Sequence, residues 1–403
     1  MKQSFSCSNF ERPQTFNTLK FITLMLSTLL ATSGFAQLVV DQNATLAQMA
    51  NLIEGTGLTI SNFTITAGNN QQYGTFTYTP DGVLGLDQGI ILSTGSCNQA
   101  IGPNNNGGSS INRPDYADPD ILMLSPLASR DACVIEFDVV PKCDTLQIDF
   151  VFASEEYNEY VCSSFNDAFA FFVSGPGING PYSNNAENFA ILPDGTGVAI
   201  GSVNNGTAGA GMNPADCESL SNAGFFVDNT GGANLQHDGF TVPLQAKGVV
   251  IPCQTYHVKL VIADAGDSSW DSAVFLKSFS CPGQLVDINP DPLFPNVVEG
   301  CQIGIFTLER NGDTTVPLDV TISYGGTATQ GTDYYLTDVF LNPMPNVISF
   351  AANETFKVFA LFGIQDFTTE GIETIDITAT WNICSEVLSA TQSFELQDVS
   401  VAL

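Results

Sequence analysis

The 403-residue sequence has few basic side chains: 11 lysines and arginines stand against 42 aspartates and glutamates, which gives a formal net charge of −31. A chain this acidic has no basic face to neutralise phosphates, so nucleic acid binding is excluded. The sequence contains only two histidines and no Cys-x-x-Cys pair, which argues against a zinc site. A Gly-x-Ser-x-Gly nucleophile motif is also absent. The composition favours cations or uncharged polar ligands.

Long apolar runs are scarce as well. FITLMLSTLLATS, at residues 21–33, follows Lys20 and Arg12 and precedes the small residues SGFA. This order is typical of a secretory signal peptide, so we expect residues 1–36 to be removed by cleavage after Ala36. The alternative is an uncleaved membrane anchor, although the run is short for a bilayer span of ~20 residues. No later stretch is apolar enough to cross a membrane. We therefore expect a secreted protein or one on a bacterial cell surface.

Nine cysteines follow the predicted signal peptide. Cysteines scattered through an exported chain are more often disulfide-bonded than metal-bound. The sequence does not fix their connectivity, and we predict pairs across neighbouring strands and within the last domain. The predicted bonds are Cys133–Cys143, Cys162–Cys217, Cys253–Cys281 and Cys301–Cys384, which leave Cys97 unpaired.

Alternating apolar and polar residues dominate the chain. The alternation is clear at residues 146–152 and 256–262, and such runs are bounded by Gly, Asn, Asp and Pro. Helical spacing is limited to residues 43–54, NATLAQMANLIE, where Thr45 or Asn43 is a suitable cap. These patterns predict an all-β protein with two β-sandwich domains. The first is lectin-like or jelly-roll-like with one short N-terminal helix.

A proline-rich segment divides the chain. Prolines recur with Asn and Asp in CPGQLVDINPDPLFPN, residues 281–296, which is typical of a linker. The predicted first domain covers residues 37–284 and the linker residues 285–296. A compact β-unit then covers residues 297–384. Residues 385–403 resemble the start of a further module or a C-terminal tail.

The second domain resembles the Calx-beta family. The resemblance is carried by VVEGCQIGIFTLERNGDTTVPLDVTISYGGTATQGTDYYL and then by VISFAANETFKVFALFGIQDFTTEGIETIDI. It implies a seven-strand, immunoglobulin-like sandwich with calcium at one end. By this resemblance the calcium ligands are Glu299, Asp333, Asp366 and Glu370. The chain departs from the family at Gly325 and Gly326, where an acidic residue is frequent, and at Gln365, where consecutive aspartates are expected. The alternative is a solvated acidic loop in a purely structural spacer domain.

The first domain resembles the choice-of-anchor L domain of secreted bacterial surface proteins. LAQMANLIEGTGLTISNFTITAG, GLDQGIILSTG and HVKLVIADAGDSSWDSAVFLKSF carry part of this resemblance. FASEEYNEYVCSSFNDAFAFFVSGPG is its most specific piece. The resemblance implies export and display on a cell surface, and it brings no established activity.

Two loops of the first domain concentrate acidic side chains. One follows the predicted strand at residues 146–152, and the other follows the predicted strand at residues 256–262. If these two hairpins are neighbours, their oxygens converge on a hard cation such as calcium. The candidate metal ligands are Glu155, Glu156, Asn166, Asp167, Asp264, Asp267 and Asp271. Tyr157 and Trp270 are candidate ring platforms for an extracellular glycan.

These patterns predict a non-catalytic bacterial surface protein that binds calcium and acts in adhesion or another extracellular interaction, with a glycan or surface protein as partner. One alternative is a carbohydrate-active enzyme or carbohydrate-binding module that uses the acidic loop. Glu156 with Asp167 or Asp271 is then the acid–base pair, because adjacent glutamates face opposite ways in a strand. Another is a spacer in a larger adhesin. A network of carboxylates and backbone N–H groups accounts for the loop without a ligand.

Overall fold

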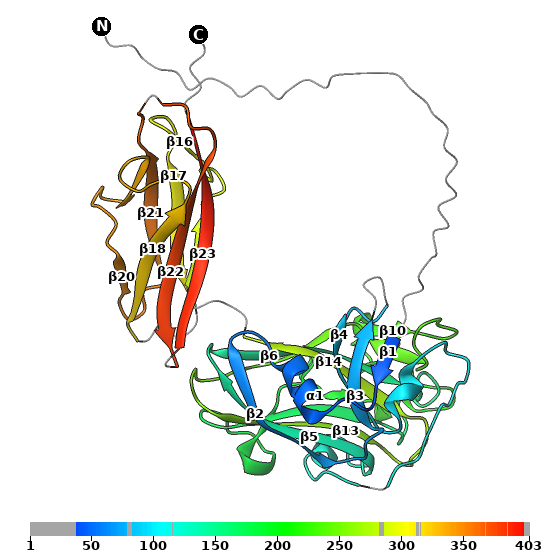
Figure 1. Ribbon diagram of the computed structural model, residues 1–403. Helices are drawn as coiled ribbons and strands as arrows, with labels where there is room; N and C mark the ends of the chain where they lie inside the picture. Colours follow the sequence, from blue (N-terminus) through cyan, green and yellow to red (C-terminus); the bar gives the residue numbers. More distant parts are fainter. Residues whose placement is uncertain are drawn as a thin grey trace, which may run out of the picture.

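The computed structural model describes residues 38–398 apart from residues 79–82, 115, 282–285, 312–313, 315, 367 and 385. The predicted signal peptide lies outside the described residues. Within them the chain is almost entirely β-structure and forms two β-sandwiches (Figure 1), which confirms the predicted fold class. None of the described helices has the length and hydropathy that a membrane span requires.

The first sandwich consists of two antiparallel sheets, A and B. In order across the sheet, sheet A contains β1 (Leu38–Asp41), β3 (Tyr73–Tyr78), β4 (Gln88–Ser93), β14 (Ser272–Ser280), β6 (Thr145–Ser154), β11 (Gly239–Thr241) and β10 (Phe226–Asp228), and β12 (Leu244–Val249) also pairs with β6. Sheet B contains β2 (Leu58–Ala67), β5 (Arg130–Pro141), β13 (Tyr256–Asp264), β7 (Ala168–Ser174) and β8 (Glu187–Asn188), and β9 (Val198–Ala199) also pairs with β7.

Aromatic side chains from the two sheets fill the core between them. Phe150 of sheet A lies against Phe169 of sheet B, with ring centroids 5.1 Å apart. Phe279 of sheet A and Phe137 of sheet B are 5.6 Å apart in an edge-to-face arrangement. Each fully buried phenylalanine contributes about 1.5–3 kcal/mol relative to an exposed one. The alternation in the sequence therefore marked the faces that the sheets bury against each other.

Short helical segments connect the strands of the first sandwich. Helix α1 (Leu46–Ile53) begins at Thr45, whose hydroxyl accepts a hydrogen bond from the Gln48 N–H while the Gln48 side chain accepts one from the Thr45 N–H. Its apolar side buries Met49 and Ile53, as the helical spacing predicted. The other helical segments are α2 (Ile121–Leu124), η1 (Cys97–Ala100), η2 (Ser183–Asn185), η3 (Pro214–Asp216) and η4 (Ala223–Phe225).

The two acidic loops of the first domain cross between the sheets. β6 belongs to sheet A and β7 to sheet B, while β13 belongs to sheet B and β14 to sheet A. The loops after β6 and after β13 are therefore arches, and the prediction that each closes a hairpin was wrong. Ser154 pairs with Ser272 across β6 and β14, and Ala168 pairs with Ala263 across β7 and β13. Both arches consequently lie at the same end of the sandwich.

The second sandwich also has two sheets. In order, one contains β15 (Val286–Pro290), β17 (Gly304–Arg310), β21 (Phe356–Gly363) and β19 (Tyr334–Asp338). The other contains β16 (Val297–Val298), β23 (Glu386–Gln397), β22 (Glu373–Ile383), β18 (Leu318–Gly326) and β20 (Val347–Phe350). β16 pairs with β23 in parallel. The opening segment thus contributes a strand first to one sheet and then to the other. The described part of this sandwich has nine strands, two more than the seven that the resemblance implied.

Two segments expected to lie outside the second sandwich belong to it. β15 falls in the predicted linker, residues 285–296, and pairs with β17 while burying Val286 and Ile288. β23 falls in the predicted tail, residues 385–403, and pairs along its whole length with β22. The prolines of this segment predicted a linker. They are compatible with a strand here because β15 is at the edge of its sheet, where proline is tolerated.

The disulfides of the first domain follow its sheet assignments. The predicted bond Cys162–Cys217 is confirmed. The predicted bond Cys133–Cys143 is wrong, because β5 and β6 belong to different sheets and form no ladder with each other. Cys133 is free and buried in the core, and Cys143 is bonded to Cys281 just after β14. Cys97 is free and buried, as predicted.

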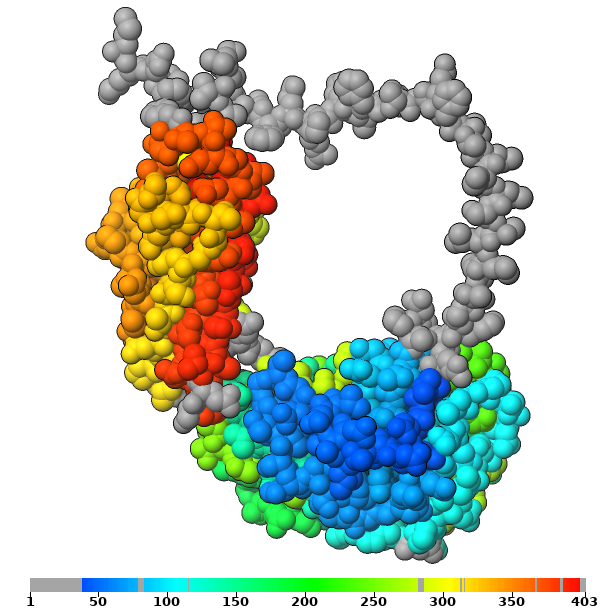
Figure 2. Space-filling model, in the orientation of Figure 1, coloured from blue at the N-terminus to red at the C-terminus, as the bar shows by residue number. Residues whose placement is uncertain are grey.

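A disulfide joins the two sandwiches. Cys253, in the loop before β13, is bonded to Cys384, which follows β22. The predicted bonds Cys253–Cys281 and Cys301–Cys384 are therefore wrong. Cys301 follows β16 at one end of the second sandwich, whereas Cys384 lies at the other end, where β22 turns into β23. In the space-filling view the second sandwich, coloured yellow to red, meets the first at that end (Figure 2).

Candidate functional site

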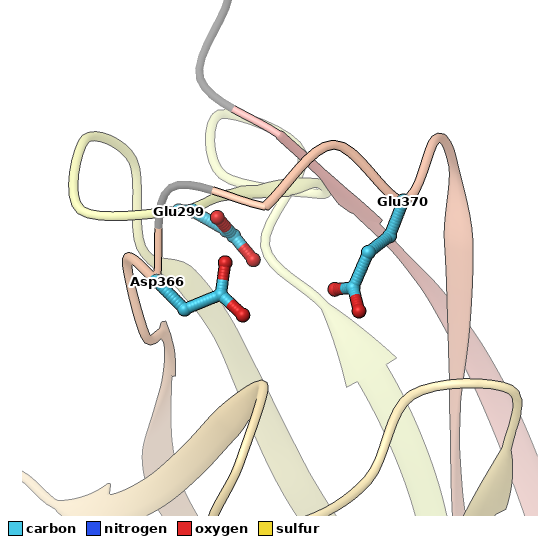
Figure 3. Close-up of side chains that lie close together, drawn as sticks. All are labelled: Glu299, Asp366 and Glu370. Carbon is cyan, nitrogen blue, oxygen red and sulfur yellow. The ribbon is translucent and has the colours of Figure 1, made fainter.

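Carboxylates gather at the end of the second sandwich that is remote from the first. Glu299 follows β16, Asp366 follows β21, and Glu370 precedes β22. Their carboxyl groups offer oxygens within 4.8 Å of one another (Figure 3). Oxygens of Asp333, Glu370 and Glu373 form a second such group. We name the apex cluster as these residues with Asp398: Glu299, Asp333, Asp366, Glu370, Glu373 and Asp398. The structure thus brings together all four ligands predicted for this domain.

Local turns hold several of these carboxylates in place. An oxygen of Asp366 accepts a hydrogen bond from the Thr368 N–H at 2.7 Å, and one of Asp333 accepts from the Thr329 N–H at 2.7 Å. An oxygen of Asp398 accepts from the N–H groups of Glu370 and Gly371 at 3.0 and 3.1 Å. Each carboxylate keeps further lone pairs that these hydrogen bonds do not use.

Repulsion between like charges shapes the apex cluster. Glu299 is 3% exposed, and burial together with the charges of Asp366, Asp398, Glu370 and Asp333 raises its pKa to about 7. Desolvation and neighbouring carboxylates also raise the pKa of Glu370 and of Glu373. A cation placed among these groups reverses this effect, since an opposite charge favours the ionised carboxylates.

Sequence reasoning missed Asp398 because it lies beyond the predicted end of the domain at residue 384. The alternation of Phe394 and Leu396 in SFELQ was a signal that a strand leads up to it. Glu373 was passed over as a ligand although it lies in the same Glu-Gly-x-Glu turn as Glu370. It is the first residue of β22, so its position is fixed by the ladder with β23.

The first domain holds a second acidic group, inside the protein where the two arches cross. Glu155 and Glu156 follow β6, Asp271 precedes β14, Asp167 precedes β7, and Asp264 ends β13. All five are buried. The two acidic loops are therefore neighbours at one end of the sandwich, as arches rather than hairpins, and the convergence of their oxygens on one cation stays a prediction. We name Glu155, Glu156, Asp167, Asp264 and Asp271 the buried acidic group.

Two members of this group accept hydrogen bonds from neighbouring residues. Asp167 accepts one from the Ala265 N–H at 2.8 Å and one from the Ser272 hydroxyl at 2.7 Å, which links the two sheets. Asp271 accepts one from the Ile111 N–H at 2.9 Å. Burial, opposed by these bonds, still raises the pKa of both carboxyls to about 7. This part of the group matches the expected carboxylate–backbone network.

Burial raises the pKa of the remaining members further. The pKa of Glu155 rises to about 8 through burial and the charge of Asp238, and that of Glu156 to about 10 through burial and the charge of Asp167. Burial and the charge of Asp167 hold the pKa of Asp264 well above its ordinary value. The neighbouring charges that contribute to these shifts are carboxylates.

Two predicted metal ligands lie apart from the buried acidic group. Asn166 donates a hydrogen bond to Glu218 at 2.7 Å and accepts one from the Gly201 N–H at 2.7 Å, so both of its side-chain polar atoms are occupied elsewhere. Asp267 is exposed at the outside of the arch, where it accepts a hydrogen bond from the Ser269 N–H. Its charge still raises the pKa of Glu156, after burial and Asp167.

The aromatic residues beside the arches do not form an open sugar platform. Tyr157 is buried, donates a hydrogen bond to the Val203 carbonyl oxygen and packs on Phe226, so its predicted role in ligand binding was wrong. Trp270 is half-buried, and its ring meets that of Tyr160 edge to face at 4.5 Å.

The acid–base alternative is not supported by the geometry of its residues. Glu156 and Asp167 are 2% and 0% exposed, so a glycosidic bond cannot reach the space between them. Asp271 is buried as well and accepts a hydrogen bond from the Ile111 N–H. Glu155 and Glu156 are both turned into the protein, rather than to opposite faces as expected for a strand, because β6 ends at Ser154.

Comparisons with known proteins agree with the sequence resemblance for the first domain. Residues 39–281 match the family of the choice-of-anchor L domain. No curated protein is similar enough to count as a relative.

Among solved structures, the apo-form Calx CBD1 domain is 18% identical, with 29% of this chain and 100% of that chain covered and a TM-score of 0.21. CBD12 from CALX1.2 is 22% identical, with 28% and 43% covered and a TM-score of 0.22. Escherichia coli alpha-2-macroglobulin activated by porcine elastase is 10% identical, with 81% and 25% covered and a TM-score of 0.21. TM-scores this low do not establish a shared fold.

Proposed function

Because the chain belongs to the choice-of-anchor L domain family, we propose that it is a non-catalytic protein of the bacterial exterior whose second sandwich binds calcium at the apex cluster. Membership of this family points to a protein that is secreted or held at the cell surface. The proposed role is adhesion or another extracellular interaction, with a glycan or a surface protein as partner. Calcium would hold the apex loops in one conformation for that contact.

The observation that carries the calcium proposal is the position of Glu299. Its carboxyl is almost fully buried, and the charges around it belong to Asp366, Asp398, Glu370 and Asp333. Ionised carboxylates this close repel one another, and a divalent cation among them replaces the repulsion with attraction. The apex cluster therefore gains stability from a cation that the unfolded chain does not hold in place.

The donor atoms favour calcium over other divalent cations. Calcium takes six to eight oxygen ligands at ~2.3–2.6 Å in flexible geometry, whereas magnesium requires a near-ideal octahedron and zinc prefers nitrogen and sulfur. The apex cluster offers carboxylate oxygens from four separate loops, and Asp366 and Glu370 are exposed, so water can complete the coordination sphere.

Thermal unfolding in a chelator and in millimolar calcium tests this proposal. Calcium at 100 times its Kd adds about 2.7 kcal/mol, and 1 kcal/mol shifts the midpoint of a domain of about 100 residues by roughly 4–8 °C. Asp366→Asn combined with Glu370→Gln should abolish the calcium-dependent rise of the second-domain transition. Asp319→Asn, which neutralises an exposed carboxylate of β18, is the matched control and should retain it. A wild-type second domain that calcium leaves unchanged would favour the spacer alternative.

A further inference from the structure

The two arches of the first domain enclose carboxylate oxygens that have no hydrogen-bond donor. Glu155, Glu156 and Asp264 are 1%, 2% and 1% exposed. Both carboxylate oxygens of Glu155, both of Asp264 and one of Glu156 are buried without a hydrogen-bond partner. Gln236 and the Ser109 N–H lie near Glu155, and Thr94 and the Asp167 carboxyl lie near Asp264. None of them makes a hydrogen bond of adequate geometry to these oxygens.

Buried polar atoms in folded proteins almost always have a partner, because removing them from water without one is costly. The cost is greatest for an ionised carboxylate, which then requires a cation, a set of donors or a proton. Donors are available elsewhere in this group, since Asp167 accepts hydrogen bonds from Ala265 and Ser272, and Asp271 accepts one from Ile111. The unpartnered oxygens of Glu156 and Asp264 therefore point to a positively charged occupant.

Another buried acidic pair in the same domain shows how the chain satisfies such groups when it uses its own cation. Asp118 and Asp120 are buried, and the ammonium group of Lys259 makes ion pairs with both. Burial alone would raise the pKa of Asp120, yet the hydrogen bonds from Lys259 and Ser183 bring it below its ordinary value. In the buried acidic group the corresponding shifts go upward.

The buried acidic group joins both sheets. Glu156 lies just beyond β6 of sheet A, and Asp264 is the last residue of β13 in sheet B. Asp167, which directly precedes β7, is a neighbouring charge of both. Arg130 is the ladder partner of Asp264 across β5 and β13, but the oxygens of Asp264 accept no hydrogen bond from it.

We propose that Glu156 and Asp264, which are both neighbours of Asp167, bind a divalent cation of the calcium class between the two sheets of the first domain. The donors are carboxylate oxygens, which suit a hard cation, and they come from two arches rather than from a rigid octahedral cage. The cation would fasten the end of β6 to the end of β13. This site is separate from the apex cluster and does not depend on the proposed function of that cluster.

The first experiment measures bound metal in the full chain with the apex cluster disabled by Asp366→Asn and Glu370→Gln. The protein is treated with a chelator, equilibrated with calcium, desalted and examined by elemental analysis. We expect a calcium ion to remain with each chain. Adding Glu156→Gln or Asp264→Asn should remove it. Glu218→Gln is the matched control, because Glu218 is an exposed carboxylate that Asn166 contacts near the same arch, and calcium should then remain.

The outcomes separate this proposal from its rivals. A folded, apex-disabled chain that retains no calcium would show that the carboxyls are instead held protonated, which overturns the proposal. Retention of calcium in the folded Glu156→Gln and Asp264→Asn variants would place the ion elsewhere and overturn it as well. If calcium does not stabilise the second domain of the wild-type chain but the first domain still retains its ion, the proposed function is contradicted and the first-domain site is not.

Terbium luminescence provides a second readout that does not depend on the carboxylate variants folding. Terbium replaces calcium at oxygen sites and is excited through a nearby tryptophan. Trp270 directly precedes Asp271 and contacts the ring of Tyr160, whose N–H donates to the Glu156 carbonyl oxygen. In the apex-disabled chain, terbium should emit on tryptophan excitation, and Trp270→Phe should remove most of that emission. Emission that survives Trp270→Phe unchanged would overturn the proposal.

Discussion

His257 lies between two carboxylates on the outer face of sheet B. Its ring nitrogens are 2.9 Å from an oxygen of Asp138 and 2.9 Å from an oxygen of Glu136. Burial alone would lower the pKa of the imidazole, but the hydrogen bonds and charges of Asp138 and Glu136 outweigh it and raise that pKa. The folded protein therefore binds this proton more tightly than the unfolded chain does.

The stability that His257 contributes should depend on pH. A raised folded-state pKa gives a contribution that is complete below the unfolded pKa of ~6.5 and is lost as the pH rises through the folded value. His257→Gln should therefore reduce the free energy of unfolding more at about pH 5 than at about pH 9. Urea unfolding of both proteins at the two pH values measures this. An equal loss of unfolding free energy at the two pH values would contradict this prediction. It would mean that solvent screens the ion pairs of these partly exposed groups completely.

Individual elements were predictable where their signal is local. The spacing of apolar residues and a capping residue at Thr45 predicted helix α1. Alternation of apolar and polar residues predicted strands β5, β6 and β13. The sheet to which each strand belongs has no such local signal. β6 and β7 therefore looked like one hairpin, although they lie in different sheets. The wrong pairs Cys133–Cys143 and Cys253–Cys281 have the same origin, since they assumed that consecutive strands are neighbours.

The candidate sites were also predictable only in part from the sequence. Their carboxylates were identified because acidic residues in an otherwise weakly charged β-protein stand out in the sequence. Whether such a residue faces inward depends on where the strand ends, and the sequence does not mark that point. Glu155 and Glu156 are both buried because β6 stops at Ser154, and Tyr157 enters the core directly after them. Asp398 was missed because β23 was taken for a tail.

The second glycine of the pair that ends β18 is required by the backbone. Gly326 has a φ of +99°, and a Cβ atom there would lie 2.2 Å from the carbonyl oxygen of Thr374. That oxygen accepts hydrogen bonds from the N–H groups of Thr327 and Ala328, so it cannot move away freely. The backbone therefore requires glycine at residue 326, whereas nothing in the structure explains Gly325.

Substitution at Gly326 should consequently destabilise the second sandwich. Gly331 is a matched control, because its φ is +87° but a Cβ atom there has no neighbour within 4 Å. Gly331→Ala should cost about 1–2 kcal/mol through backbone strain alone. Gly326→Ala should cost about 1–3 kcal/mol more, because the Thr374 carbonyl must shift. Denaturant unfolding in a chelator compares the two variants. Equal losses would mean that the ladder between β18 and β22 adjusts without cost.

On the scale of the whole molecule, the two sandwiches have separate cores and a covalent connection. The apolar side chains of β5, β6, β7 and β13 pack within the first domain, and those of β17, β21, β22 and β23 within the second. The Cys253–Cys384 bond joins residues 131 positions apart and anchors the turn after β22 beside the first domain (Figure 1). The apex cluster at the far end of β22 is thereby held away from the first domain.

Removing this bond should loosen the arrangement of the domains without unfolding either one. Each domain keeps its own core when Cys253 and Cys384 are both replaced by serine, so we expect two thermal transitions close to those of the wild type and a larger radius of gyration in small-angle X-ray scattering. The matched control replaces Cys162 and Cys217, whose bond lies within the first domain. That variant should lower the first-domain transition, since losing a native disulfide typically costs about 2–5 kcal/mol, while its scattering profile stays that of the wild type. A Cys253→Ser, Cys384→Ser chain with an unchanged scattering profile would show that non-covalent contacts alone fix the two domains. The disulfide would then add stability without setting the direction in which the apex cluster is presented.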